Sequence, residues 1–219
     1  ARDRDGFTAL HVIAYSGGEK DAVDVRAELA GLLIAGGTDI RAKDTQGKSA
    51  LHLAAMKGRT ELLAPLRASI HAVDDRGRTP LHDAAAYAQL QVIKGLLDAG
   101  AVLAAKDQEG DTPLHLAAGR FRVTATQQLL DAGADADSTN AKGRPPLHML
   151  ALVESDEPEV ERQLPAVAEA LVARGANVDA RDAAGETPMQ SAMRKNHTGL
   201  AETLRRHGPD HPRTCSDVR

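Results

Sequence analysis

A short phrase built on Thr-Pro-Leu-His recurs along this chain at nearly constant spacing. It is most complete at residues 77–82 and 110–118, and looser copies stand at 7–11, 49–52, 145–148 and 187–190. The glycine that opens each copy stands at position 6, 47, 77, 110, 143 or 185, so the gaps are 41, 30, 33, 33 and 42 residues. A phrase that returns at a near-fixed period predicts a series of similar structural units rather than one central core.

Each copy of the phrase predicts the start of a short helix. Thr79 and Thr112 can cap a helix N-terminus, and Pro80 and Pro113 then occupy the first helical position, where a missing N–H does no harm. Leucine and paired alanines follow, and a second apolar helix comes after them. The glycines predicted to end the second helices are Gly100, Gly133 and Gly175. Since one such helix pair cannot bury its own apolar face, the units must stack.

Three motifs recur together in one order: Asp-x-x-Gly, Thr-Pro-Leu-His-x-Ala-Ala and Leu-Leu-x-x-Gly-Ala. They resemble the ankyrin repeat family over about residues 3–208, and two of the gaps equal the 33-residue period of that family. The resemblance implies an all-α fold, an ankyrin-repeat solenoid of stacked helix–turn–helix units with protruding β-turn or hairpin tips. We predict one domain over residues 1–219, with repeats at about 1–43, 44–73, 74–106, 107–139, 140–181 and 182–209, the last a cap, and a polar tail at 210–219.

Three repeats depart from the regular length. Repeat 1 carries about eight extra residues around 17–21, before a second helix that we expect to be lengthened. Repeat 2 is about three residues short and lacks the terminal glycine, which predicts an irregular turn at 67–69. Repeat 5 carries about nine extra residues in the acidic segment 154–161, where Pro158 can start a helix and Pro165 either kinks it or starts the next. Whether these inserts hold a partner or are only surface elaborations stays open.

Composition excludes several classes of function. The net charge of −4 sets up no field for nucleic acid or an anionic membrane, and no apolar run reaches membrane-spanning length. The single cysteine, Cys215, allows no intrachain disulfide, and we interpret it as an idle thiol in the tail. We expect no nucleic-acid partner, no membrane insertion and a monomer when free. The chain opens with Ala1 and shows no signal peptide, so we expect a soluble protein that is cytoplasmic or exported after N-terminal processing.

Nine histidines raise the question of a metal site. Five of them are the motif residues, one to a repeat: His11, His52, His82, His115 and His148. Stacked helices lie about 8–10 Å apart, so these rings cannot converge on an ion whose bonds are about 2 Å long. We expect instead that the ring nitrogens bridge backbone groups of adjacent turns, as the resemblance implies. No nucleophile elbow, phosphate-binding glycine loop or His-Glu-x-x-His motif is present, so we expect no enzyme activity, no cofactor and no metal.

The ankyrin resemblance places the partner surface on the concave face, which is made by the turn tips and by the fourth and fifth residues after each motif histidine. Aromatic residues are only 2% of the chain, and all four map to or beside these positions. Tyrosine and arginine dominate interface hot spots. The residues expected to bind protein are Phe7, Tyr15, Met56, Lys57, Arg76, Arg78, Tyr87, Glu109, Asp111, Arg120, Phe121, Lys142 and Arg144. The alternative is that each ring packs on a neighbouring turn.

The charges at the tips alternate in sign from repeat to repeat, which suits a specific protein surface better than a phosphate backbone. We therefore predict a non-catalytic protein–protein binding module. Its abundant alanine and its excess of arginine over lysine resemble proteins of GC-rich bacterial genomes. For a small ankyrin chain of this appearance with no second domain, we expect a bacterial inhibitor or immunity-type protein that covers a cognate enzyme. The alternative is a scaffold, or a secreted effector, that docks on host or regulatory proteins.

Overall fold

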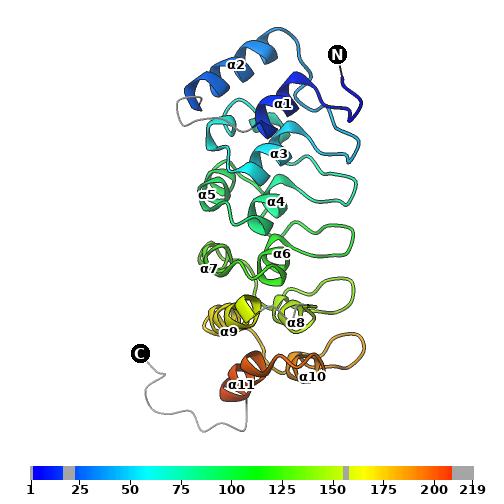
Figure 1. Cartoon of the computed structure of the whole chain (residues 1–219), viewed down its shortest axis with the longest axis vertical. Helices are drawn as coiled ribbons and strands as arrows, with labels where there is room; N and C mark the ends of the chain where they lie inside the picture. Colours follow the sequence, from blue (N-terminus) through cyan, green and yellow to red (C-terminus); the bar gives the residue numbers. More distant parts are fainter. Residues whose placement is uncertain (1, 17–22, 155–157, 209–219) are drawn as a thin grey trace. The chain divides into compact units, whose positions relative to one another are not determined.

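The computed structural model describes residues 2–16, 23–154 and 158–208, and it divides into two compact units, Ala1–Pro113 and Leu114–Arg219. Every regular element in the described ranges is helical, which confirms the predicted all-α class (Figure 1). The extra residues at 17–21 and the polar tail at 210–219 lie outside the described ranges. The two units are described separately, and the single domain over residues 1–219 stays a prediction.

In the first unit, each repeat supplies an inner helix and a second helical segment behind it. The inner helices are α1 (Ala9–Tyr15), α3 (Ala50–Lys57) and α4 (Pro80–Ala86). The second segments are α2 (Val23–Ala35), the 3-10 turns η2 (Thr60–Leu62) and η3 (Arg67–Ser69), and α5 (Leu90–Asp98). Helix α3 packs between α1 and α4, while η2 contacts both α2 and α5. The turns that lead into the inner helices project from the same side (Figure 1).

The second unit repeats this arrangement. Its inner helices are α6 (Pro113–Gly119), which begins at the last residue of the first unit, α8 (Pro146–Ala151) and α10 (Pro188–Arg194). Its second helices are α7 (Val123–Asp131), α9 (Pro158–Val172) and α11 (Thr198–His207). Helix α8 packs on α10, and α9 packs between α7 and α11. Pro158 starts α9 as predicted, and α9 continues through Pro165, so no second helix starts there.

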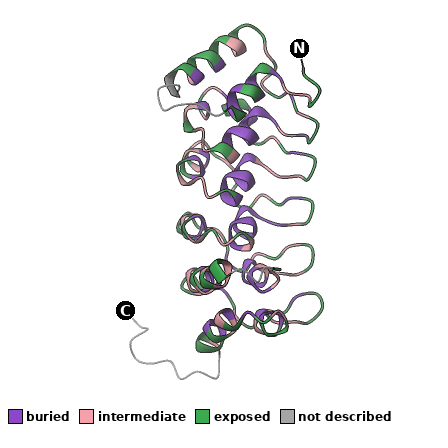
Figure 2. Ribbon diagram, viewed as in Figure 1, coloured by how far each residue is buried: buried purple, intermediate pink, exposed green. Residues whose placement is uncertain are grey.

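Small residues allow the helices to stack closely. Ala54 and Ala55 of α3 are fully buried, and the inner helices form a continuous buried layer in each unit (Figure 2). A Cβ atom added at Gly95 would lie 2.4 Å from Cδ1 of Leu63, so a larger residue there would force the leucine to move. A core of leucine and alanine therefore fills the stack without large aromatic rings.

The glycines predicted to end the second helices have this role. The N–H of Gly100 donates to the carbonyl of Leu97 and the N–H of Ala101 to that of Leu96, each at 2.9 Å, as in a Schellman motif. Gly100 has a φ of 96°, which only glycine adopts readily. Gly133 and Gly175 repeat the same bonds and sign of φ.

Repeat 2 is irregular, as predicted. Two 3-10 turns replace its second α-helix, and a buried ion pair of 3.1 Å joins Arg26 of α2 to Glu61 of η2. Helix α2, with 13 residues against 9 in α5, confirms the lengthened second helix of repeat 1. Repeat 1 is therefore held to its neighbour by an ion pair as well as by apolar packing.

The motif histidines bridge adjacent repeats, as predicted. Nε2 of His11 bonds to the backbone carbonyl of Lys48 at 3.0 Å, and Nε2 of His52 to that of Arg78 at 2.8 Å. A carbonyl only accepts, so Nε2 carries the proton and Nδ1 is an acceptor. Nδ1 of His52 accordingly lies 3.1 Å from the backbone nitrogen of Ser49 and 2.9 Å from its hydroxyl oxygen. One neutral ring therefore caps its own helix and holds the next turn.

His148 lacks half of this arrangement. Pro145 precedes α8 and has neither a hydroxyl group nor a backbone N–H. Nε2 of His148 still bonds to the carbonyl of Glu186 at 3.0 Å, but its Nδ1 is buried with no hydrogen-bond partner among the described residues. A buried polar atom without a partner costs about 1–3 kcal/mol, so position 145 is a local source of instability.

Replacing Pro145 with threonine should raise the free energy of unfolding by about 1 kcal/mol, because the new N–H and hydroxyl can both donate to Nδ1 of His148. The added flexibility of the unfolded chain offsets part of the gain. Urea unfolding followed by circular dichroism measures the change. The control Ser49→Ala removes one such donor and should lower stability by about 1 kcal/mol. A Pro145→Thr variant no more stable than the original would contradict this explanation.

Candidate functional site

The first unit brings two of the predicted binding residues, Phe7 and Lys57, into contact with a third, Tyr15. The ammonium group of Lys57 lies 4.4 Å from the centre of the Tyr15 ring, in cation–π geometry. The Phe7 ring meets Tyr15 edge-on at 6.0 Å between ring centres, and it stacks on His11 at 5.6 Å. Phe7 is half-buried, while the Tyr15 side chain is 49% exposed. Phe7 therefore packs on neighbouring rings, whereas Tyr15 is held by Phe7 and Lys57 and remains exposed to solvent.

Met56 and Tyr87 occupy similar positions at the ends of the next two inner helices, α3 and α4. Met56 lies in the last turn of α3 and is half-buried, and Tyr87 follows the last residue of α4 and is exposed. The amide Nε2 of Gln89 donates to the carbonyl of Met56 at 3.1 Å, which ties the loop after α4 to the end of α3. Since α3 packs on α4, the first unit presents Tyr15, Lys57 and Tyr87 on successive helix ends.

The turn tips divide into two kinds of position. Residues directly before the turn glycine, such as Arg76, Glu109 and Lys142, are exposed, as predicted. Residues directly after it face the next turn instead. Nε of Arg78 lies 3.3 Å from Asp107, and Nε of Arg144 lies 2.9 Å from Asp182.

The predicted alternation of tip charges therefore needs correction. Arg78 and Arg144 are half-buried in ion pairs between repeats, and the side chain of Asp111 is buried, with the residue only 7% exposed. The backbone carbonyl of Asp111 bonds to Nε2 of His82 at 3.0 Å. The sequence contains a pattern that indicates these ion pairs. Arg78 and Arg144 are each followed, at the first turn position of the next repeat, by an aspartate, Asp107 or Asp182.

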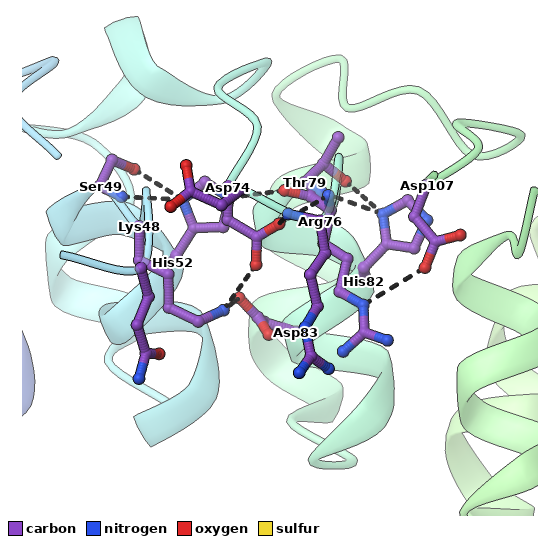
Figure 3. Close-up of polar contacts among 12 residues, drawn as sticks. Lys48, Ser49, His52, Asp74, Arg76, Thr79, His82, Asp83 and Asp107 are labelled. Carbon is purple, nitrogen blue, oxygen red and sulfur yellow. Dashed lines mark hydrogen bonds and ion pairs between the residues drawn. The ribbon is translucent and has the colours of Figure 1, made fainter. Parts of the chain in front are cut away.

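A buried charge cluster lies where the turns of repeats 2 and 3 meet (Figure 3). The Lys48 ammonium lies 3.1 Å from Asp74 and 2.8 Å from Asp83, and all three side chains are largely buried. Burial alone would lower the pKa of Lys48, but the two carboxylates outweigh it and raise that pKa. Burial likewise opposes the ionised form of Asp74, yet the N–H groups of Arg78 and Arg76 and the Lys48 charge lower its pKa.

Asp83 behaves differently from Asp74. Burial raises the pKa of its carboxyl group, against the attraction of Lys48. Asp83 directly follows His82, at the position that Leu53 occupies in the repeat before. Lys48 therefore compensates a carboxylate in an apolar layer, and we interpret the cluster as part of the stacking.

The second unit contains Arg120 and Phe121, which follow α6. Arg120 is exposed and Phe121 half-buried. Phe121 has a φ of 60°, in the left-handed region that costs a bulky residue about 1–2 kcal/mol. The same link between helices has Gly58 in repeat 2, Ala88 in repeat 3 and Asn196 in repeat 6, all with positive φ. Phenylalanine is thus placed where the backbone favours glycine or asparagine.

Both ends of the segment 154–161 of repeat 5 are bonded to the last repeat. Glu154 pairs with Lys195 at 2.8 Å, and the hydrogen bond from Lys195 lowers the pKa of Glu154. Glu161 bonds to Nδ1 of His197, whose Nε2 bonds to the carbonyl of Val153 at 3.0 Å. His197 is one of the four histidines that lie outside the repeated phrase. It occupies the position of Gln89, which also bonds to the carbonyl of the preceding inner-helix end.

The described residues contain no group of three His, Cys, Asp or Glu side chains placed to hold a metal ion. None of the helices in the described ranges is both long enough and apolar enough to cross a lipid bilayer. The groups displayed at the predicted site are aromatic rings and single charges, which suit the recognition of another surface.

The chain also matches a known protein family. A family model described as ankyrin repeats in three copies matches residues 22–107 and 122–215. The matched segments cover more than half of the chain and include parts of both compact units.

The motif histidines make stability depend on pH. Burial lowers the pKa of His52 to about 4, from about 6.5 for the free side chain, and it also lowers the pKa of His82 and His148. Between these two pKa values, His52 is protonated in the unfolded chain but not in the folded protein. The free energy of unfolding should therefore fall as the pH falls through this range. Each such proton contributes a slope of about 1.4 kcal/mol per pH unit.

We therefore expect His52→Gln to flatten the dependence of unfolding free energy on pH between about pH 6 and 4.5, by up to one proton's slope. Glutamine is the matched change, because Oε1 of Gln190 already accepts from the N–H of the capping Thr187 at 2.9 Å. Urea titrations at several pH values measure the slope. The variant should also be less stable at pH 7, since it loses the bridge to Arg78. An unchanged slope would rule out His52 as a source of the dependence.

Proposed function

Because the chain belongs to the ankyrin repeat family, we propose that it binds a protein partner through the exposed helix ends and turn tips that carry Tyr15, Lys57, Arg76 and Tyr87. Ankyrin repeats form a non-catalytic protein–protein interaction fold. The observation that carries the choice of surface is the Tyr15 ring, which is half exposed although Lys57 and Phe7 hold it in place. A fixed aromatic ring loses little conformational freedom on binding, which is typical of a hot spot.

The scaffold beneath this ring supports the same proposal. The bridges from His11 and His52 and the ion pairs of Lys48 hold successive turns together before any partner arrives. Preformed turns need little ordering, so binding energy is retained as affinity. This favours a tight complex, and we therefore propose an inhibitor that covers a cognate enzyme, ahead of a scaffold that docks transiently.

The double change Tyr15→Ala and Tyr87→Ala should weaken partner binding by on the order of thirtyfold or more, as loss of interface hot spots does. Both rings are about half exposed, so helical circular dichroism should not change and the unfolding midpoint should fall only slightly. The measurement is affinity capture from the native source with the full chain as bait, followed by titration of the captured protein. Val102→Ala is the matched control, since Val102 is exposed in the turn after α5, outside the proposed surface.

Two outcomes would refute this choice of surface. One is capture that survives the double change, and the other is a double variant that unfolds, because the rings would then be structural. A captured enzyme that the added chain inhibits supports the inhibitor role. A captured protein whose activity is unaffected supports the scaffold instead.

Phe121 provides a separate test in the second unit. Phe121→Gly removes the strain of a φ of 60° and should raise the unfolding free energy by about 1 kcal/mol. If the ring contacts the partner, the same change should weaken capture, so that stability and binding move in opposite directions. Urea unfolding and partner titration of one variant measure both. A ring that only packs on a neighbour would give lower stability and unchanged binding.

A further inference from the structure

The outer side of the first repeat has the pattern of an internal interface. Val12 directly follows the motif histidine of α1 and is 50% exposed, whereas Leu53, at the same position of α3, is 4% exposed because α1 covers it. Leu29 stands eight residues before the glycine that ends α2 and is 44% exposed, whereas Val92 at that position of α5 is 0% exposed. Val25 and Leu32 extend the exposed apolar stripe of α2. We define these four residues of α1 and α2 as the outer face.

Within the described residues, two backbone groups beside this face lack bonds that their counterparts make. In the two following repeats, the residue directly after the turn glycine is Lys48 or Arg78. Its backbone carbonyl accepts two hydrogen bonds, one from Nε2 of a motif histidine and one from a backbone N–H of the turn. In the part of the chain that the structure describes, the Phe7 carbonyl receives only the N–H of Asp3, at 3.0 Å. Likewise Thr45 N–H donates to the Asp5 carbonyl at 3.0 Å, but the corresponding N–H of Arg4 meets no acceptor within the described residues.

The turn that joins two repeats is nevertheless complete at this end. Oδ1 of Asp3 accepts from the N–H groups of Asp5 and Phe7 at 3.0 and 2.8 Å. Oδ1 of Asp44 makes the same two bonds in the turn between repeats 1 and 2. Residues 3–7 thus already have the conformation of a connection between two repeats.

We propose that the outer face is covered by a further helix pair of the same repeat type, carried by the same polypeptide ahead of residue 1. Such a repeat would place an inner helix over Val12 and a second helix over Leu29. It would also bring a ring Nε2–H to the Phe7 carbonyl and a turn carbonyl to the N–H of Arg4. The interface would continue the one between α1 and α3, and it lies apart from the surface proposed above to bind a partner.

A second copy of this chain fits the face less well. The last repeat has Gln190 in place of the motif histidine, and α11 ends in the exposed residues Arg205, Arg206 and His207. A polar outer helix is what a capping repeat presents to water. Head-to-tail stacking would therefore place charges against Leu29 and offer no ring to the Phe7 carbonyl.

The test adds the missing repeat. In the full chain, a copy of residues 74–106 is placed directly before Asp3, which sets the copied motif histidine in register. Amide hydrogen exchange in α1 and α2 should slow by on the order of tenfold or more, because their opening would then require a neighbour to open. The matched control is the same fusion with Val12→Lys and Leu29→Lys. These changes should abolish the slowing while leaving exchange in the unextended chain nearly unchanged, since both side chains are exposed there.

Three results would overturn the proposal. The first is a folded fusion in which exchange in α1 and α2 is as fast as in the original chain. The second is a dimer of the original chain in light scattering that Leu29→Lys dissociates, since a second copy would then cover the face. The third is an intact mass of 23.1 kDa for the polypeptide isolated from its native source. The expected results are slowed exchange, a monomer, and a larger native mass.

Discussion

One neutral imidazole ring in each of the three repeats of the first unit carries much of the structure of that unit. Its Nδ1 accepts from the residue that caps its own helix, and its Nε2 donates to the turn of the next repeat, as at His11 and His52. The ring does both only while it is neutral, because protonated Nδ1 would become a donor facing another donor. The hydrogen bond from Nε2 therefore sets the position of the next turn tip. Burial of the ring keeps it neutral, because burial lowers the pKa of His52.

Much of the fold could be predicted because the repeated phrase contains its own local physics. Thr79 and Pro80 specify a helix start, Gly100 specifies an end, and the role of the motif histidine follows from the family resemblance. The tip charges were harder to predict. Arg76 and Arg78 differ by two positions around one glycine, yet the first is exposed and the second bonds to Asp107. Periodicity assigns a residue to a turn, whereas the direction of its side chain depends on the turn that follows.

Departures from the phrase have two different physical meanings. Pro145 and Asp83 occupy positions inside the stack, so their effects are an unpaired Nδ1 at His148 and an ion pair with Lys48. Tyr15 and Phe121 occupy positions at its edge, where an exposed ring or a strained backbone gives the stack no evident gain. Only the three-dimensional structure separates the two kinds of departure, because both are equally visible in the sequence. It is the reason for assigning binding to the second kind.

The irregular second repeat also affects how the first unit unfolds. Elsewhere in this unit a full α-helix backs the inner helix, but here two 3-10 turns and the pair Arg26–Glu61 connect α2 to the repeats beyond. In stacked repeats, each repeat is stabilised by its nearest neighbours. Behind the inner helices, the first repeat is thus joined to its neighbours by short 3-10 turns, whereas repeat 3 has the full helix α5 at that position. Local opening that begins at the first repeat would therefore extend into repeat 2 before it reaches α4 and α5 of the same unit.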